Sequence, residues 1–516
     1  MPRLFADICV FAHGLGVKYV WIDTICIRQD DVEEWNRESP QMVRYYQDAW
    51  VTVVAANSAV NNGLLNMQRP ESVPRIARLP YMNKDGEKRG YFYLQPAQPN
   101  VLRKEFTVGV EKSELLQRGW VFQEWKLSRR IIAFSESDFF LYCHTLGSTS
   151  LMGDHLSGAG VQLGHGPESD GRIMRGLDNI TSLGSSPSTY WEDIVMKYSG
   201  LGLTYLAKDR LMALAGVASE VGRAMEGLED TSNSSGHMLS DDVLARQYLF
   251  GLWLINIHEG LLWEQAKGGS RERLPGIPTW SWASMARPVI NEDNEPILTG
   301  ISVRWPKSGF SQRQRQRVCA IHKATTISVD DKTWLPQFNN RPVPDEVPQY
   351  EYGNENRFVV LTFHSSLIPA QIERLLSEQD ADFADRLTST RSSPTPPARD
   401  HPWGMDLWRG VCLPIDLSRI VGWASVEHPE LQSDEEIASC SGSICALFLE
   451  RCVEKGGWSR WGRALVTRVV FTVLLIRRIT IPGFDESFER VGVGRLFGKE
   501  VDREYSSARK TTISLV

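Results

Sequence analysis

The first sixty residues alternate between two kinds of hydrophobic spacing, and this alternation constrains the fold more than any other feature of the chain. Residues 4–16 place apolar side chains at helical spacing and end near glycines, whereas Val17–Ile22 is a short apolar run that ends at Asp23. A second helical stretch follows, and Trp50–Ala56 is again a nearly continuous apolar run. The order helix, strand, helix, strand predicts an α/β fold with a parallel sheet.

A capping signal marks the start of the second helix. Asp31 precedes Glu34 by three residues, which is the spacing of an N-cap residue and its capping-box partner. The helix that follows is predicted to carry one apolar stripe, formed by Trp35, Met42, Tyr46 and Ala49.

An insertion interrupts this alternation before it resumes. Residues 57–112 are polar, contain Pro and Gly turns, and are predicted to carry a hairpin at Gly90–Gln95. The alternation then continues with a helix around Trp120 and with apolar runs at Ile131–Phe134 and Phe139–Cys143, which we predict to be strands.

The second half of the chain has a different composition. Residues 144–189 are rich in Gly and Ser and are expected to form a long loop, and helical patterns return at 190–225 and 241–258. From about residue 290 short β-type runs dominate, while residues 377–401 are polar, contain Pro and are expected to be disordered. The predicted β runs are Phe358–Phe363, Val411–Ile415, Ile444–Glu450, Val469–Ile476 and Thr511–Val516.

Length, charge and cysteine content limit the classes of protein to which this chain can belong. A length of 516 residues allows two or more domains, and a net charge of −6 gives no electrostatic case for nucleic-acid binding. The eight cysteines include no CxxC pair and fit reduced thiols in a cytosolic protein, so no metal site is predicted. The N-terminus lacks a secretory signal, and the apolar segment Ala464–Ile476 is too short and too charged to span a bilayer. We therefore expect a cytoplasmic protein without a membrane span.

Trp120 and Glu124 are the most informative pair of side chains. They stand four residues apart, so on a helix the indole and the carboxylate share one face. A carboxylate beside an aromatic wall, on a helix flanked by strands, suits the stabilisation of a developing cation. The pattern alone leaves a surface glutamate on an amphipathic helix as the alternative. GxSxG, HExxH and P-loop signatures are absent from the sequence.

Several long segments occur in an order that resembles the fungal heterokaryon incompatibility (HET) domain. The N-terminal ones are YVWIDTICIRQDDVEEWNRESPQMVRYYQDAWVTVVAAN (19–57) and RGWVFQE (118–124). Further agreement follows in WEDIVMKYSGLGLTYLAKDRLMALAGVA (191–218), YLFGLW (248–253), LLW (261–263), PTWSWASM (278–285), FERVGVGRLF (488–497) and TISLV (512–516).

The resemblance implies a fold and a domain plan. HET domains look related to the Toll/interleukin-1 receptor (TIR) fold, a flavodoxin-like parallel sheet whose ligands bind at the carboxyl ends of the strands. We expect the HET core at 1–145, with the insertion at about 57–112. The rest of the HET-family region, a loop plus helices that end in PTWSWAS, is expected at 146–289, and a mostly β region at 290–516.

One expected element of the family pattern does not occur in this sequence. HET domains usually open with a strand of the type Tyr-x-x-Leu-Ser-Tyr-x-Trp-Gly ahead of the segment that here reads WID at 21–23. Relative to that pattern the chain is N-terminally truncated. In a flavodoxin-like strand order the lost strand is an interior one, so Val17–Ile22 is expected to lack a partner on one side.

The resemblance also implies a site. Some TIR-like domains cleave NAD at its glycosidic bond with a single glutamate in a Trp-Cys-x-x-Glu pattern, and Trp120-Val-Phe-Gln-Glu124 occupies the corresponding place, with Val121 where cysteine would be. Glu124 is therefore the implied catalytic residue, and NAD would be a substrate rather than a cofactor. The implied nucleotide-binding residues are Asp23, Trp120, Arg118 and Gln123.

Each of these binding residues also has a structural alternative. Trp120 would otherwise anchor the core, and Asp23 would cap the turn that follows it. Arg118 would otherwise bridge to the insertion, and Gln123 would bond a loop carbonyl.

The function implied by the resemblance is that of a vegetative incompatibility factor. Its HET domain would trigger programmed cell death on non-self recognition, through protein partners in incompatibility signalling and a homo-oligomer. Two alternatives stay open: a non-enzymatic oligomerising signalling module, and an inactive truncated paralogue.

Overall fold

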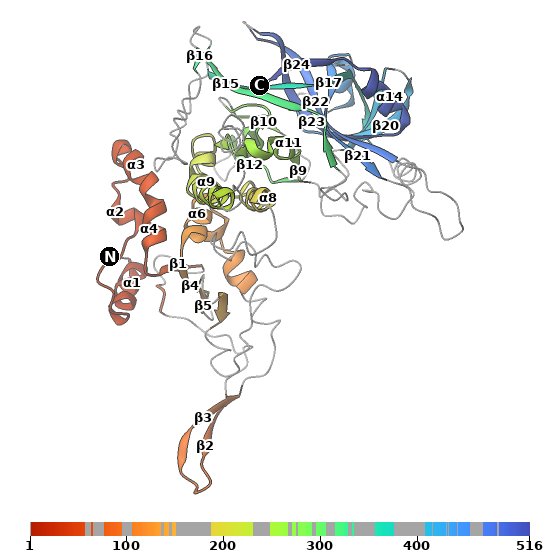
Figure 1. The fold of residues 1–516 in the computed structure, drawn as a ribbon. Coiled ribbons are helices and arrows are strands. Elements are labelled where there is room, and N and C mark those ends of the chain that lie inside the picture. The colour runs from red at the N-terminus through yellow and green to blue at the C-terminus, as the bar shows by residue number, and fades with distance from the viewer. Residues whose placement is uncertain are drawn as a thin grey trace.

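We analysed a computed structural model of the chain (Figure 1). It describes residues 2–56, 63–65, 77–94, 106–135, 139–143, 147–150, 187–230, 248–266, 271–274, 277–290, 296–305, 315–328, 333–334, 357–375, 408–414, 416–429, 431, 433–440, 442–454, 468–481 and 484–516. The predicted disordered segment 377–401, and most of the predicted loop 144–189, lie outside these residues.

The first predicted helix is confirmed, but the strand predicted after it is wrong. Helix α1 spans Arg3–Gly14 and has no fully buried side chain. Val17–Ile22 has no regular secondary structure and joins no ladder with any strand that the structure describes, and Tyr19 is 89% exposed. Apolar content alone does not make a strand, because a ladder needs a neighbouring backbone to pair with.

The second predicted helix begins as expected but does not continue. Asp31 is the N-cap of α3 (Val32–Glu38), and its Oδ1 accepts a hydrogen bond from the backbone N–H of Glu34 at 2.9 Å. The prediction of one continuous helix is wrong, since a 3₁₀ turn at Ser39–Gln41 separates α3 from α4 (Met42–Asp48). The second residue of that turn is proline, which cannot donate a hydrogen bond to the preceding turn.

A mixed four-stranded sheet follows, in the order β1-β4-β5-β6. Only β1 and β4 pair in parallel, so the predicted parallel sheet holds for that pair, and the other two pairings are antiparallel. The short connection between β4 and β5 allows a hairpin but no crossover. The strands are β1 (Thr52–Ala55), β4 (Arg130–Phe134), β5 (Phe139–Cys143) and β6 (Gly147–Ser150).

The insertion carries a hairpin, as predicted, with wider bounds. Strands β2 (Ala77–Met82) and β3 (Lys88–Leu94) pair with each other, and among the described strands they pair with no other. Figure 1 shows this hairpin projecting away from the rest of the molecule.

Three helices pack against one another. Helix α6 spans Gly119–Leu127, and the helical pattern predicted at 190–225 corresponds to α8 (Pro187–Tyr198) and α9 (Leu206–Asp230). Helix α6 packs on α9, and α9 packs on α8. Gly216 lets α9 lie close to Val43 of α4, because a Cβ at position 216 would be only 2.5 Å from the Val43 side chain.

The helix predicted at 241–258 is wrong over residues 248–253, and within its described part only residues 257–258 are α-helical. Residues 248–253 instead form a tight hairpin, with strands β7 (Tyr248–Leu249) and β8 (Leu252–Trp253). Gly251, at the turn, has φ +89°, and its carbonyl oxygen accepts hydrogen bonds from the indoles of Trp191 (2.9 Å) and Trp282 (3.0 Å). A short 3₁₀ turn (Leu254–Asn256) and α11 (Ile257–Gly260) follow.

The C-terminal region is mostly β, as predicted. Two small sheets come first, one of β9 (Glu264–Gln265) with β13 (Val303–Arg304) and one of β10 (Glu272–Arg273), β11 (Met285–Ile290) and β12 (Pro296–Gly300). An eleven-stranded sheet then contains β14 (Arg315–Arg317), β15 (Ala320–Ser328), β16 (Thr333–Trp334), β17 (Arg357–Pro369), β18 (Gln371–Leu375), β19 (Trp408–Leu413), β20 (Asp416–Val426), β21 (Ile444–Glu454), β22 (Arg468–Ile481), β23 (Phe484–Phe497) and β24 (Lys510–Leu515). Helices α13 (Asp434–Ser439) and α14 (Lys499–Ser507) lie between its later strands in the sequence.

One hydrophobic core joins the helices to this large sheet. It contains side chains of α8 and α9, the buried indoles of Trp263, Trp280 and Trp282, and side chains of β17, β21, β22 and β24 such as Phe363 and Leu447. Residues on both sides of the predicted domain boundary at 289/290 contribute to this core, and the boundary itself stays a prediction.

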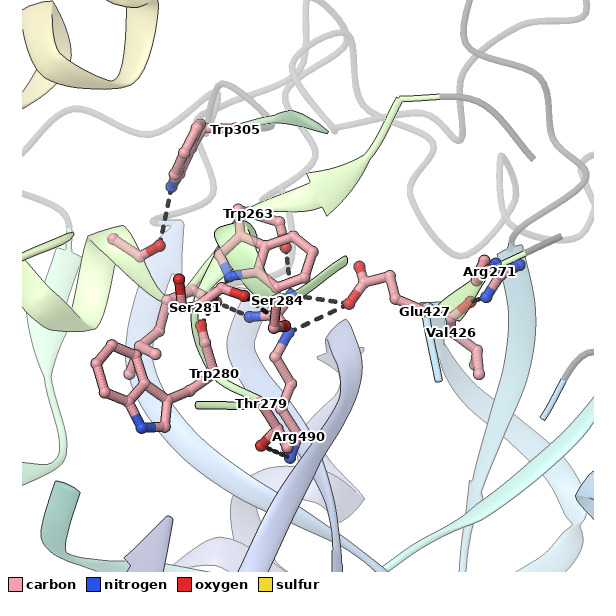
Figure 2. A network of polar contacts seen from close by, with 12 residues as sticks. Trp263, Arg271, Thr279, Trp280, Ser281, Ser284, Trp305, Val426, Glu427 and Arg490 are labelled. Carbon is pink, nitrogen blue, oxygen red and sulfur yellow. Dashed lines mark hydrogen bonds and ion pairs between the residues drawn. The ribbon is translucent and has the colours of Figure 1, made fainter. Parts of the chain in front are cut away.

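A buried ionic network connects three of the motif segments (Figure 2). Arg490 on β23 is 1% exposed and stacks 3.7 Å from the ring centroid of Trp263. Its guanidinium donates to the carbonyl oxygens of Leu261 and Trp263, and to Glu427 Oε2 at 2.9 Å. Its backbone N–H donates to Thr279 Oγ1 at 3.1 Å. The segments LLW, PTWSWASM and FERVGVGRLF thus meet at one residue, Arg490.

Candidate functional site

A cavity of about 790 Å³ lies in the N-terminal region. Its walls are α1, the segment Val17–Ile22 with the adjoining Asp23, α4, β1 and α6. Most of the lining is apolar and aromatic, and Phe5, Phe11 and Trp125 are among the contributing side chains. A concave apolar space with a few polar groups is the usual form of a small-molecule site.

The cavity runs along the open edge of β1. Consecutive residues from Asp48 to Ala55, and from Tyr19 to Asp23, all line it. Side chains of a strand point alternately to the two faces of the sheet. A cavity lined by every residue of β1 therefore lies beside the backbone of that strand, and not on one face of the sheet. This placement agrees with β1 being the last strand at its end of the described sheet.

Glu124 occupies the polar part of the cavity wall. Its side chain lines the cavity and is partly exposed there. The surrounding protein shields the carboxyl from most of the solvent, and this burial raises its pKa to about 7. A hydrogen bond from the Tyr46 hydroxyl opposes that rise, the neighbouring Asp23 adds to it, and Arg118 opposes it. A carboxyl with such a pKa changes its charge near neutral pH.

Asp23 and Arg118 reach the same cavity from different elements. Asp23 closes no strand, contrary to prediction; it is the first residue of α2 (Asp23–Cys26), and its Oδ1 accepts from the backbone N–H of Thr24 at 2.7 Å. Arg118 is exposed and stands at the N-cap position of α6. The structure thus brings together three predicted site residues: Glu124, Asp23 and Arg118.

Trp120 and Gln123 point elsewhere, toward α9. The Trp120 indole N–H donates to Asp209 Oδ2 at 3.2 Å, and its ring meets Trp35 edge to face at 5.9 Å. Gln123 is 2% exposed, and its Oε1 accepts from the backbone N–H of Gly216 at 2.8 Å. Neither side chain lines the cavity. Their predicted nucleotide contacts stay predictions, while the contacts described here join α6 to α9.

The Trp120 hydrogen bond can be tested by a conservative change. We expect Trp120→Phe to lower the free energy of unfolding by about 1–3 kcal/mol, because it leaves the partly buried Asp209 without a donor while keeping an aromatic ring against Trp35. Chemical denaturation measures this loss. Since Asp209→Asn keeps an acceptor for the indole, it should cost clearly less; an equal cost in both variants would contradict the assignment.

Tyr46 is a site residue that the sequence did not indicate as one. It was predicted only as part of the apolar stripe of the second helix. In the structure its hydroxyl bonds Glu124, and burial together with the charge of Glu124 raises the pKa of Tyr46 well above its ordinary value. No local spacing links the two residues, since α4 and α6 meet only in the tertiary fold.

Within the described part of the chain one group has donor atoms placed for a cation. Potential ligand atoms of His258, Glu259 and Glu450 lie within 4.8 Å of one another. These residues do not line the cavity around Glu124. Among the described residues there is also no helix of the length and apolar character needed to cross a membrane.

A comparison with known protein families gives a match to the N-terminal region. A family model described as heterokaryon incompatibility protein (HET) matches residues 1–124, which include α1, α4, β1 and the first part of α6 up to Glu124. No curated protein and no solved structure matches the chain. All the residues that line the cavity except Trp125 lie within the segment that matches the heterokaryon incompatibility (HET) family model.

Proposed function

We propose that the HET region is the effector of a heterokaryon incompatibility response and that it triggers cell death by hydrolysing the glycosidic bond between nicotinamide and ribose in NAD. The observation that carries this proposal is the position of Glu124: a carboxyl with a pKa near 7, bonded to Tyr46, on the wall of a cavity of about 790 Å³. The HET match over residues 1–124 supports the incompatibility role.

The chemistry needs an anion beside a developing cation. When nicotinamide leaves, positive charge accumulates on the ribose ring, and a carboxylate held in a site of low polarity stabilises that charge strongly. Water then adds to the ribosyl carbon and loses a proton, giving ADP-ribose and free nicotinamide. The cationic side chain of Arg118 favours the ionised form of Glu124 and also suits a phosphate group.

The remaining parts of the cavity suit a dinucleotide. Aromatic side chains on its walls, among them Tyr19, Trp21 and Trp50, offer surfaces on which a base can stack. A TIR-like relationship for this region remains part of the proposal, and the parallel pairing of β1 with β4 supports it.

The test is nicotinamide release by the purified full-length chain incubated with NAD. We expect release by the wild type and a loss of about 10²–10³-fold in Glu124→Gln, which keeps the shape of the side chain but removes the anion. Glu114→Gln is the matched control, because Glu114 is an exposed glutamate on the adjacent turn and does not line the cavity; it should keep the wild-type rate.

The opposite outcomes are equally definite. If the wild type releases no nicotinamide, or if Glu124→Gln releases it as fast as the wild type, the enzymatic proposal fails. Cell death that persists in Glu124→Gln on expression would then favour the non-enzymatic oligomerising module, for which the open edge of β1 offers a pairing surface.

A further inference from the structure

The β2–β3 hairpin has an exposed apolar face. Leu79 and Phe92 are opposite one another in the strand register, and Tyr81 comes two residues after Leu79, so the three side chains share one side. They are 47%, 54% and 47% exposed in the order Leu79, Phe92 and Tyr81. The rings of Tyr81 and Phe92 meet edge to face at 5.1 Å, which makes the apolar face a continuous ordered surface.

The other side of the hairpin is cationic. Arg78 and Lys88 both lie over the ring of Tyr91, with 3.3 Å from the Arg78 Cζ and 4.2 Å from the Lys88 Nζ to the ring centroid. Between residues 77 and 94 the sequence has four Lys and Arg and two Asp and Glu, which gives a net charge of four minus two, or +2. The whole chain carries −6, so the hairpin is a local positive element.

The turn fixes which residues appear on each side. Asn83 Oδ1 accepts hydrogen bonds from the backbone N–H groups of Asp85 (3.0 Å) and Glu87 (2.7 Å), and Gly86 adopts φ +81°. A slip of one residue would exchange the two faces, so this turn maintains the separation of apolar and cationic side chains. An isolated two-stranded hairpin is only marginally stable in water, and a surface that covers its apolar face would stabilise it.

We propose that this hairpin docks on an anionic lipid surface. A bilayer surface accommodates both sides at once: the apolar face enters the boundary between headgroups and acyl chains, and Arg78, Lys84 and Lys88 reach lipid phosphates. This is the division of side chains found in interfacial amphipathic helices, and tyrosine is enriched at that depth. Arg89 forms an ion pair with Glu87 at 3.3 Å within the hairpin. A protein partner on the apolar face alone would leave the cations without a counterpart.

The docking is shallow rather than spanning. The outer edges of β2 and β3 carry backbone groups that no other described strand pairs with, and such groups are costly in the hydrocarbon layer. Attraction between the Lys and Arg side chains and an anionic surface adds to the binding and is screened by salt.

Vesicle flotation of the full-length chain tests the proposal. The vesicles are phosphatidylcholine alone, or phosphatidylcholine mixed with phosphatidylserine. The wild type should float with the anionic vesicles at low salt, and less at high salt. The triple variant Leu79→Ser, Tyr81→Ser, Phe92→Ser should lose binding by about tenfold or more, because removal of three apolar contacts costs well over 1.4 kcal/mol.

A matched control distinguishes binding through this hairpin from nonspecific binding of exposed aromatic side chains to the vesicles. Tyr205→Ser removes a 68% exposed aromatic side chain elsewhere on the surface and should float like the wild type. The thermal unfolding midpoint of the triple variant should stay unchanged, since none of its three residues belongs to a buried core.

Three results would overturn the proposal. They are no flotation of the wild type, equal flotation of the triple variant, and equal binding to neutral and anionic vesicles. Self-association of the wild type in sedimentation velocity without vesicles, abolished in the triple variant, would instead identify the hairpin as a contact between copies of this chain.

Discussion

Arg490→Met is expected to lower the free energy of unfolding by about 3–5 kcal/mol. The guanidinium forms the ion pair with Glu427, which is equally buried, and methionine would leave that carboxylate with only the charges of Arg271 and Arg273 and without its hydrogen-bonded partner. The change also removes donors to the carbonyl oxygens of Leu261 and Trp263. Chemical denaturation followed by tryptophan fluorescence measures the loss, because Trp263 itself stacks on Arg490.

A double variant distinguishes the charge effect from lost packing. Combining Arg490→Met with Glu427→Gln removes both charges, so part of the lost stability should return. If Arg490→Met alone lowers the free energy of unfolding by less than about 1 kcal/mol, the network is solvated and does not stabilise the fold as predicted.

Glu124→Gln is expected to make the protein more stable at pH 8, by about 3 kcal/mol. The folded-state pKa of Glu124 is about 7 against an ordinary value of 4.5, so the folded chain holds this proton more tightly than the unfolded chain does. The contribution of the protonated Glu124 carboxyl to the free energy of unfolding is therefore fully present below about pH 4.5 and is lost as the pH rises through 7. Each unit of pKa difference corresponds to 1.36 kcal/mol, and glutamine removes the penalty.

The pH dependence of the difference is the control. Wild type and variant should have similar stability at pH 4, and the gap should open between about pH 5 and pH 7. Comparing the two proteins at each pH cancels the contributions of other buried carboxyls, such as Glu264, whose pKa burial also raises to about 7. A variant less stable than the wild type at pH 8 would contradict the placement of Glu124 in a site of low polarity.

The two measurements on Glu124→Gln support each other. A variant that gains stability while losing nicotinamide release cannot owe that loss to unfolding. Such a trade-off is common where a site keeps an unfavourable charge for the sake of its chemistry.

Local signals in the sequence predicted local structure well. Asp31 is an N-cap as its spacing with Glu34 indicated, because that interaction spans three residues. The runs at 131–134 and 139–143 are strands as predicted. Val17–Ile22 has similar composition but forms no ladder, since pairing depends on a neighbour that its own residues do not specify.

The candidate site was also predictable only in its local part. The four-residue spacing placed Trp120 and Glu124 on adjoining parts of α6, yet the tertiary packing separates their surroundings. Trp120 bonds Asp209 of α9, while Glu124 meets Tyr46 of α4 and the cavity. Both partners come from distant parts of the sequence, so no pattern within the RGWVFQE segment could have indicated them.

The end of the family match within α6 has a consequence for transplantation experiments. A fragment that stops at residue 124 contains β1 but not β4, the strand with which β1 pairs, and cuts α6 before its last turn. The hydrogen bonds of Trp120 and Gln123 further tie α6 to Asp209 and Gly216 of α9. The smallest piece that could carry this cavity into a chimaera therefore extends at least through α9, well past the segment by which the family is identified.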